Sequence, residues 1–173
     1  VVKSLRKVTD LYFDCHLMIS NPGDYVAAFR RAGADGCTIH VEAGNTADVI
    51  SEMRDLGLDV GLACSPDTPL EAIEDYLDQI DMLLVMTVVP GFGGQKFMDQ
   101  VMPKLERARL EVEKRNLRVK IQVDGGIDAH TGPIACGHGS DTYVAGSSII
   151  EAEDPVMAAI EIREAIRKTR ESL

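Results

Sequence analysis

One carboxylate stands where a group that moves protons would be useful. Asp124 follows a short apolar run and precedes two glycines, in the segment Val123-Asp124-Gly125-Gly126-Ile127. A carboxylate at the carboxyl end of a strand points into the mouth of a parallel sheet, where such folds keep their catalytic groups. The alternative is an aspartate that only bonds the backbone of its own turn. The position favours an acid–base role for Asp124.

Two histidines also stand at predicted strand ends. Alternation along the first strand puts Asp14, His16 and Met18 on one side of the sheet. An imidazole and a carboxylate from different strand ends can share a metal ion, but two ligands are too few for a tight site. His40 ends the next strand, and the sequence leaves open whether it is a ligand or a structural histidine.

Three consecutive strand-like runs end in glycine. The loops are Pro90-Gly91-Phe92-Gly93-Gly94-Gln95, Gly125-Gly126 and Gly146-Ser147-Ser148. Glycine lets backbone N–H groups approach a ligand with no Cβ in the way, and in α/β barrels the loops after the last two strands frequently bind phosphate. The three loops together predict a phosphate site. The alternative for the third loop is that it only caps a helix.

The elements that would position these groups alternate along the chain. Strands are predicted at residues 11–17, 37–41, 58–64, 82–88, 119–123 and 142–145, and helices at 25–32, 46–56, 69–77, 96–116 and 154–172. A strand–helix repeat of this kind predicts right-handed βαβ units in one parallel sheet. We expect a single domain over residues 1–173. The pattern alone allows either a (β/α)₈ barrel or an open doubly wound sheet.

Composition narrows the class of protein. The 173 residues are 45% hydrophobic and 27% charged, with a net charge of −10. Such a surface repels phosphate backbones, so we expect no nucleic-acid partner, although backbone N–H groups can still hold a local anion. No apolar run reaches the ~18 residues of a membrane span, so no membrane association is expected.

The cysteines point to a compartment. Cys15, Cys37, Cys64 and Cys136 form no CxxC pair, and three of them lie in apolar strand-like runs. We interpret them as reduced, buried thiols, and the sequence shows no signal peptide. A cytoplasmic location is expected.

Taken together, the motifs resemble those of the ribulose-phosphate 3-epimerase family. The matching segments are Asp14-Cys15-His16-Leu17-Met18-Ile19, Thr38-Ile39-His40-Val41-Glu42-Ala43, residues 80–97 with their run Met86-Thr87-Val88-Val89-Pro90-Gly91-Phe92-Gly93-Gly94-Gln95-Lys96-Phe97, Val123-Asp124-Gly125-Gly126-Ile127 and Val144-Ala145-Gly146-Ser147-Ser148. They occur in the family's order and cover essentially the whole chain. The resemblance implies an α/β fold, the (β/α)₈ TIM barrel.

The resemblance also implies a reaction and its residues. The family interconverts D-ribulose 5-phosphate and D-xylulose 5-phosphate by two-base proton transfer at C3, assisted by a divalent metal: Zn, Fe(II), Mn or Co. Asp124 would be the second catalytic aspartate and a metal ligand, and His16 a metal ligand that also meets substrate. The substrate and its phosphate would lie against Gly91, Phe92, Gly93, Gly94, Gly125, Gly126, Gly146 and Ser147, under an apolar cap of Met18 and Met86.

The sequence departs from the family at its beginning. Two family strands precede the one that holds His16; they carry a substrate-binding Ser and a His-x-Asp-x-Met-Asp-Gly segment, which this sequence lacks. We therefore expect about six βα units, without the first two strands, the first catalytic Asp or two of the four metal ligands. Val1 stands where a methionine would start a gene product. The expectation is an N-terminally truncated epimerase that needs the missing segment for activity.

Two other functions stay open. The chain could be a non-catalytic phosphosugar-binding homologue, or an epimerase of a six-carbon ketose phosphate such as allulose 6-phosphate. A small phosphorylated sugar is the expected partner in all three cases. Because the family is oligomeric, a homo-oligomer is expected as well.

Overall fold

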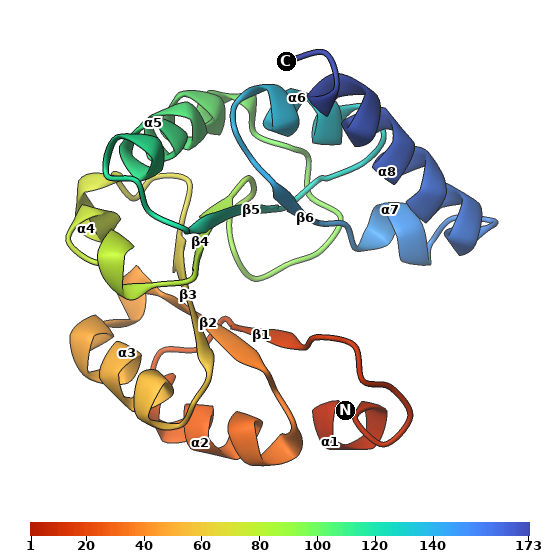
Figure 1. Ribbon diagram of the computed structural model, residues 1–173. Coiled ribbons are helices and arrows are strands. Elements are labelled where there is room, and N and C mark those ends of the chain that lie inside the picture. The colour runs from red at the N-terminus through yellow and green to blue at the C-terminus, as the bar shows by residue number, and fades with distance from the viewer.

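The computed structural model describes residues 1–173 as one curled parallel sheet with helices on its outer face (Figure 1). The strands are β1 Asp14–Leu17, β2 Gly36–His40, β3 Asp59–Cys64, β4 Met82–Met86, β5 Lys120–Asp124 and β6 Thr142–Val144. Each strand pairs in parallel with its neighbours in chain order, β1-β2-β3-β4-β5-β6. This confirms the α/β prediction of six βα units of a barrel, with β1 and β6 as its two edges.

The helices lie between the strands. The α-helices are α1 Val2–Leu5, α2 Gly23–Ala32, α3 Thr46–Asp55, α4 Glu71–Glu74, α5 Met102–Lys114, α6 Thr131–Gly137, α7 Ser147–Ile150 and α8 Pro155–Arg170; the 3₁₀ turns are η1 Val41–Ala43, η2 Leu77–Gln79 and η3 Asp99–Val101. Asp154 begins α8 as the sequence predicts, because its carboxylate accepts from the backbone N–H groups of Val156 and Met157.

The two faces of the sheet bury different side chains. Alternate strand residues such as Ile39, Leu62 and Val123 face the helices, in a core cluster of 31 buried residues. Residues on the other face, inside the curl, form a separate cluster of four, Ala63, Leu84, Met86 and Val88. The period of two in a strand makes this division. The polar residues of the inner face, His16 and Asp124 among them, are therefore directed away from the main core.

Two predicted elements are shorter than expected. The strand over 11–17 begins at Asp14, because the Leu11 carbonyl accepts from Arg6 Nη1 in the preceding turn. The helix over 96–116 begins only at Met102, after η3, because Met98 donates its N–H to the Thr87 carbonyl and holds the chain extended.

A third predicted element is divided. The helix over 69–77 appears as α4 and then η2, with a tight bond from Tyr76 N–H to the Ile73 carbonyl between them. Helices α1, α6 and α7 lie outside the five predicted helix ranges. Gly146 precedes α7 directly, so the third glycine loop does begin a helix.

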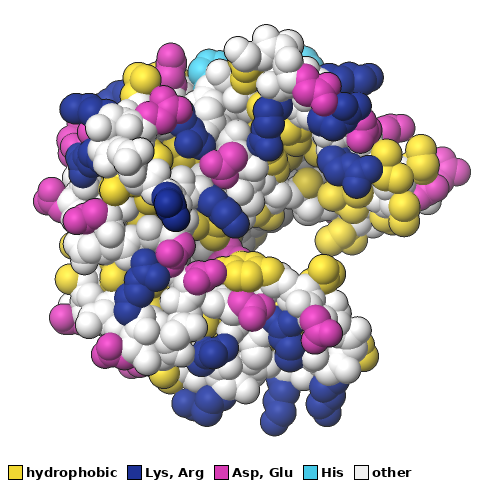
Figure 2. Space-filling view, viewed as in Figure 1, with side chains coloured by type: hydrophobic (Ala, Val, Ile, Leu, Met, Phe, Trp, Pro, Cys, Tyr) yellow, Lys and Arg dark blue, Asp and Glu magenta, His cyan; other side chains and the backbone are white.

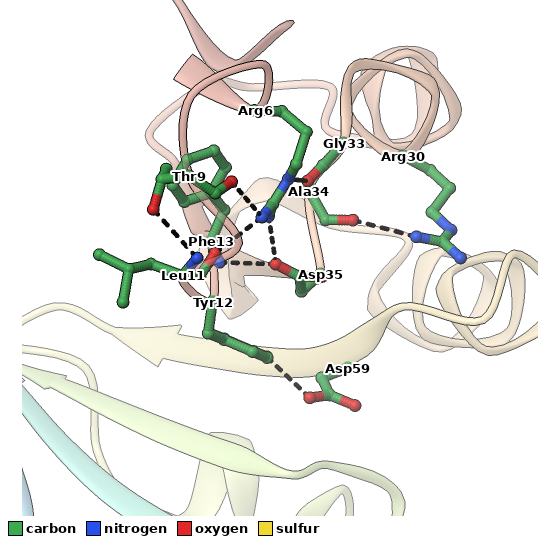
Figure 3. Close-up of polar contacts among 10 residues, drawn as sticks. All are labelled: Arg6, Thr9, Leu11, Tyr12, Phe13, Arg30, Gly33, Ala34, Asp35 and Asp59. Atoms are coloured by element: carbon green, nitrogen blue, oxygen red, sulfur yellow. Dashed lines mark hydrogen bonds and ion pairs between the residues drawn. The ribbon is translucent and has the colours of Figure 1, made fainter.

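The amino ends of the strands are held by a recurring contact, which we call the Arg–Asp clamp. Figure 3 shows the first copy: Arg6 ion-pairs with Asp35 and donates from Nε to the Gly33 carbonyl at 2.9 Å. The same Asp35 carboxylate accepts the backbone N–H of Phe13 at 2.8 Å. The clamp thus joins a helix to the starts of two adjacent strands.

Two further clamps have the same pattern. Arg54 pairs with Asp81, which accepts from Val60 N–H, and Arg109 pairs with Asp141, which accepts from Ile121 N–H. Both arginines also donate to the carbonyl two residues before their aspartate, those of Gln79 and Gly139. The three clamps join β1 to β2, β3 to β4 and β5 to β6. They therefore divide the sheet into three pairs of neighbouring strands.

One side of the molecule is open. In Figure 2 the surface is indented between the part that contains β1 and the part that contains α7 and α8, and hydrophobic side chains gather over the latter. Ile150, Val156 and Met157 are among the exposed residues there.

No helix has the length and apolar character that crossing a membrane requires. All four cysteines are free thiols, and burial raises the pKa of the Cys64 thiol to about 11.

Candidate active site

The carboxyl ends of the strands surround a pocket of about 210 Å³. Eleven of its lining residues are those that the sequence analysis named: Met18, Met86, Gly91, Phe92, Gly93, Gly94, Asp124, Gly125, Gly126, Gly146 and Ser147. Val88, Pro90, Gln95 and Val144 complete the lining. Residues from the ends of β1, β4, β5 and β6 are therefore brought to one place, although they lie more than a hundred positions apart in the chain.

Asp124 is the only carboxylate in the lining of this pocket. It ends β5, paired in register with Met86 at the end of β4. Its Oδ2 lies 3.3 Å from His16 Nδ1, a contact that reaches from the first strand to the fifth because the sheet curls. No hydrogen bond within the chain involves Oδ1 of Asp124. One oxygen is thus held by the protein and the other has no hydrogen-bond partner in the chain.

His16 itself does not line the pocket. Its side chain is 15% exposed and lies beside Asp124. Its second ring nitrogen, Nε2, lies 2.8 Å from Nε2 of His40, and the two ring planes are within 17° of parallel, with centroids 5.0 Å apart. His16 therefore orients Asp124 in this structure, and its predicted contact with substrate stays a prediction.

The two glycines after Asp124 are required by their surroundings. Gly125 and Gly126 have φ values of +126° and +65°, which L side chains rarely adopt. A Cβ on Gly125 would lie 2.4 Å from the Val88 side chain, and one on Gly126 would lie 2.5 Å from the backbone nitrogen of Phe97. The second glycine loop therefore packs directly against the residues that flank the first, against the Val88 side chain and the Phe97 backbone.

Side chains to which the sequence analysis gave no role shape these loops. Thr87 donates from Oγ1 to the Gly125 carbonyl at 2.6 Å, and Thr131 donates to the Gly126 carbonyl at 2.6 Å. Gln95 folds back to donate to the carbonyls of Val89 and Phe92. These bonds use carbonyl groups, so they leave backbone N–H groups of the loops for a ligand. A hydroxyl or amide next to each glycine run was the signal available in the sequence.

The lining contains no Lys or Arg. An anion in this pocket would therefore be held by backbone N–H groups, as the glycine content predicts. This agrees with the chain's net charge of −10, since such a site needs no basic surface. The chemistry on offer is an anion cradle with one ionisable oxygen beside it.

A second network lies beside the pocket, in an adjoining hollow that shares Met18, Pro90 and Gly91 with it. His40, which is 8% exposed, turns its Nδ1 toward Glu42 Oε2 at 3.2 Å. Glu42 Oε1 accepts from the Ser65 N–H at 2.8 Å and from the Thr68 hydroxyl. Burial alone would raise the pKa of Glu42, but these hydrogen bonds outweigh it and lower the pKa to about 2. The sequence analysis left His40 undecided and did not consider Glu42.

The side chains around His16 and Asp124 do not make up a complete site for the divalent metal that the resemblance implies. His16 and Asp124 are neighbours, as predicted, but no group of three or more His, Cys, Asp or Glu side chains comes together in a way that could hold a metal ion. Both ring nitrogens of His16 are already engaged, with Asp124 and with His40. Residues 1–173 in this arrangement do not fit a metal centre by themselves.

Several solved structures have a similar fold. The chain superposes on 3-hexulose-6-phosphate synthase from Salmonella typhimurium with a TM-score of 0.73 and 24% identity, over 97% of this chain and 79% of that one. It superposes on 3-keto-L-gulonate-6-phosphate decarboxylase from Vibrio cholerae with a TM-score of 0.71 and 16% identity, over 97% and 78%. At this identity the likeness supports the barrel fold alone.

Sequence relatives are closer. The chain is 42% identical to ribulose-phosphate 3-epimerase from Mycobacterium tuberculosis, over 94% of this chain and 72% of that protein. It is 41% identical to the Bacillus subtilis enzyme of that name, over 94% and 76%, and 40% identical to the cytoplasmic isoform from rice, over 99% and 74%. The family model described as "Ribulose-phosphate 3 epimerase family" matches residues 1–150. That match covers every strand and the whole pocket, and with it the chain belongs to the ribulose-phosphate 3-epimerase family of enzymes.

Proposed function

We propose that this site epimerises D-ribulose 5-phosphate to D-xylulose 5-phosphate by proton transfer at C3. One observation carries the proposal: a single carboxylate, Asp124, stands beside a pocket lined with glycine backbone from three consecutive strand ends. The names of the relatives support the substrate.

Asp124 would move the proton on one face of the sugar: it returns a proton to C3 when D-ribulose 5-phosphate is converted, and it is the base in the reverse direction. In that reverse direction its carboxylate takes the C3 proton of D-xylulose 5-phosphate, and the electron pair of that C–H bond moves toward the C2 carbonyl to give an enediolate. Return of a proton to the opposite face of C3 gives the epimer, while return from Asp124 restores the starting sugar. His16, at 3.3 Å, keeps the carboxylate turned toward the pocket. Met86 lies beside Asp124 and, with Met18, keeps water from the reacting carbon.

A second candidate function has its own support. Inversion at C3 needs a proton donor on the other face, and the pocket lining contains no carboxylate or histidine besides Asp124. A chain with one base would bind the sugar phosphate and exchange the C3 proton of one epimer without inversion. A purely binding homologue would not exchange it at all.

Deuterium exchange separates these outcomes. The chain is incubated with D-ribulose 5-phosphate in D₂O, and separately with D-xylulose 5-phosphate, while NMR follows C3 deuteration and the appearance of the other epimer. Deuteration with conversion supports the epimerase, and deuteration without conversion supports a one-base site. Binding without deuteration would reject catalysis by Asp124. A parallel incubation with allulose 6-phosphate decides between five- and six-carbon substrates.

Three further expectations belong to this proposal. The divalent metal stays a prediction. Of the side chains in this chain, His16 and Asp124 would be its two ligands. The homo-oligomer stays a prediction too, which sedimentation equilibrium can test; β1 and β6 each have a strand neighbour on one side only. We also propose a cytoplasmic location, in line with the printed name of the rice relative.

A further inference from the structure

A continuous line of contacts leads from the pocket to a residue with no part in the proposed chemistry. Asp124 contacts His16, His16 contacts His40 through the two Nε2 atoms, and His40 contacts Glu42. The separations are 3.3, 2.8 and 3.2 Å. Glu42 itself lies outside the pocket lining.

The far end of this line is the firmly held one. Both oxygens of Glu42 are engaged: Oε2 with His40, and Oε1 with the Ser65 N–H and the Thr68 hydroxyl. Two segments besides its own therefore fix this carboxylate: the end of β2 and the turn after β3. Asp124, in contrast, has one protein contact through its side chain, the one to His16.

The line has a direct geometric consequence. An imidazole held at one nitrogen can still rotate about its χ2 bond, whereas contacts at both nitrogens fix its plane. His16 is held at Nδ1 by Asp124 and at Nε2 by His40. His40 is held at Nε2 by His16 and at Nδ1 by Glu42. Removal of Glu42 frees His40 first and His16 next.

We propose that Glu42 is a positioning residue for the proton transfer, and that it orients the Asp124 carboxylate through His40 and His16. This rests on the proposed function of Asp124. Small displacements of a reacting group are costly, since an error of about 1 Å can lower a rate on the order of a hundredfold. Glu42 should therefore affect the rate of proton transfer and not the binding of substrate.

The test combines kinetics with spectroscopy on the full chain. The variants are Glu42→Ala, which removes both arms, and Thr68→Val, which removes one donor to Glu42 without touching a histidine. The control is Glu113→Gln, an exposed glutamate on α5 without an ion pair. C3 exchange gives kcat and KM, long-range ¹H–¹⁵N spectra report the ring nitrogens of His16 and His40, and thermal melting checks folding.

We expect Glu42→Ala to lower kcat roughly ten- to a hundredfold with KM nearly unchanged. The ring signals of His16 should shift in this variant, although Glu42 does not touch His16. Thr68→Val should change both readouts less and in the same direction, and Glu113→Gln should change neither. If Glu42→Ala does not fold, Thr68→Val and Glu42→Gln carry the test.

Two results would overturn the proposal. In one, an active wild type is matched by an equally active, folded Glu42→Ala. In the other, the His40 signals shift and those of His16 stay in place, so the line of contacts is broken at the histidine pair. A wild type that exchanges no C3 proton rejects the proposed function first, and the positioning role falls with it; this is distinguishable, since the variants are then equally inactive.

Discussion

The two ends of the same six strands are built from different interactions. At the amino ends, three Arg–Asp clamps join charged side chains to strand backbone. In each clamp the aspartate pairs with its arginine and also accepts a backbone N–H. At the carboxyl ends, glycine backbone and hydroxyl groups shape loops, and Asp124 keeps one oxygen without a protein partner. Barrels commonly separate stability from catalysis in this way. The difference teaches that the carboxylates of the clamps are engaged by the protein, whereas Asp124 at the chemical end keeps one oxygen free for a ligand.

The sharpest test of this comparison is Asp124→Asn. The amide keeps the size of the side chain and can still contact His16, but it cannot take a proton. We expect C3 exchange to fall by about 10²–10⁴-fold, with the unfolding midpoint nearly unchanged. NMR exchange and thermal melting on the same sample measure both. Undiminished exchange would show that the base lies elsewhere, and a large loss of stability would show that the carboxyl ends also support the fold.

Gly126→Ala should disturb the loops rather than the chemistry. Its Cβ would meet the Phe97 backbone nitrogen at 2.5 Å, and the φ of +65° disfavours any L side chain, at a cost of roughly 1–2 kcal/mol. Because the first two glycine loops then separate, we expect affinity for inorganic phosphate to fall on the order of tenfold. Isothermal titration measures it. The control is Gly137→Ala, where a Cβ meets nothing within 4 Å; equal affinities in both variants would contradict the loop packing.

The structural end makes the opposite prediction. Asp141→Ala removes the partner of Arg109 and leaves the Ile121 N–H without its side-chain acceptor. We expect a loss of about 1–3 kcal/mol of unfolding free energy, with C3 exchange unchanged. Denaturant titration measures the loss. The control is Glu164→Gln on α8, whose pair with Arg167 has a similar distance, 2.8 Å against 2.7 Å, but is more exposed; it should cost clearly less than Asp141→Ala. Equal losses would mean that the clamps act as ordinary surface pairs.

The sequence predicted the carboxyl ends better than the amino ends. Glycine loops and Asp124 are recognisable because short motifs determine both the backbone conformation and the chemistry. The clamps are not, because each joins an arginine to an aspartate 27 to 32 residues later, across a register that only the folded sheet defines. The same reason hides Glu42, whose partners Ser65 and Thr68 follow the next strand. Helix limits failed where a tertiary bond decided them, as Met98 to Thr87 does before α5.

Glu42 does not follow this division between the two ends of the strands. It lies at the carboxyl ends, but both of its carboxylate oxygens have partners in the protein, as in the clamps. Its folded pKa of about 2 is below its ordinary value of 4.5. A carboxyl with a lowered pKa stabilises the fold fully above its unfolded pKa, and this contribution disappears as pH falls through the folded value. The difference in melting temperature between wild type and Glu42→Gln should therefore be largest near pH 6, narrow below pH 4.5 and vanish near pH 2. Because the Glu42 side chain is 35% exposed, we expect this substitution to have a smaller effect than Asp124→Asn, Gly126→Ala or Asp141→Ala. A difference in melting temperature that persists at pH 2 would mean that the shape of the Glu42 side chain, and not its charge, holds His40. A difference that disappears as the pH falls would mean that Glu42 acts through its charge, as the aspartates of the clamps do, although it lies at the carboxyl ends of the strands.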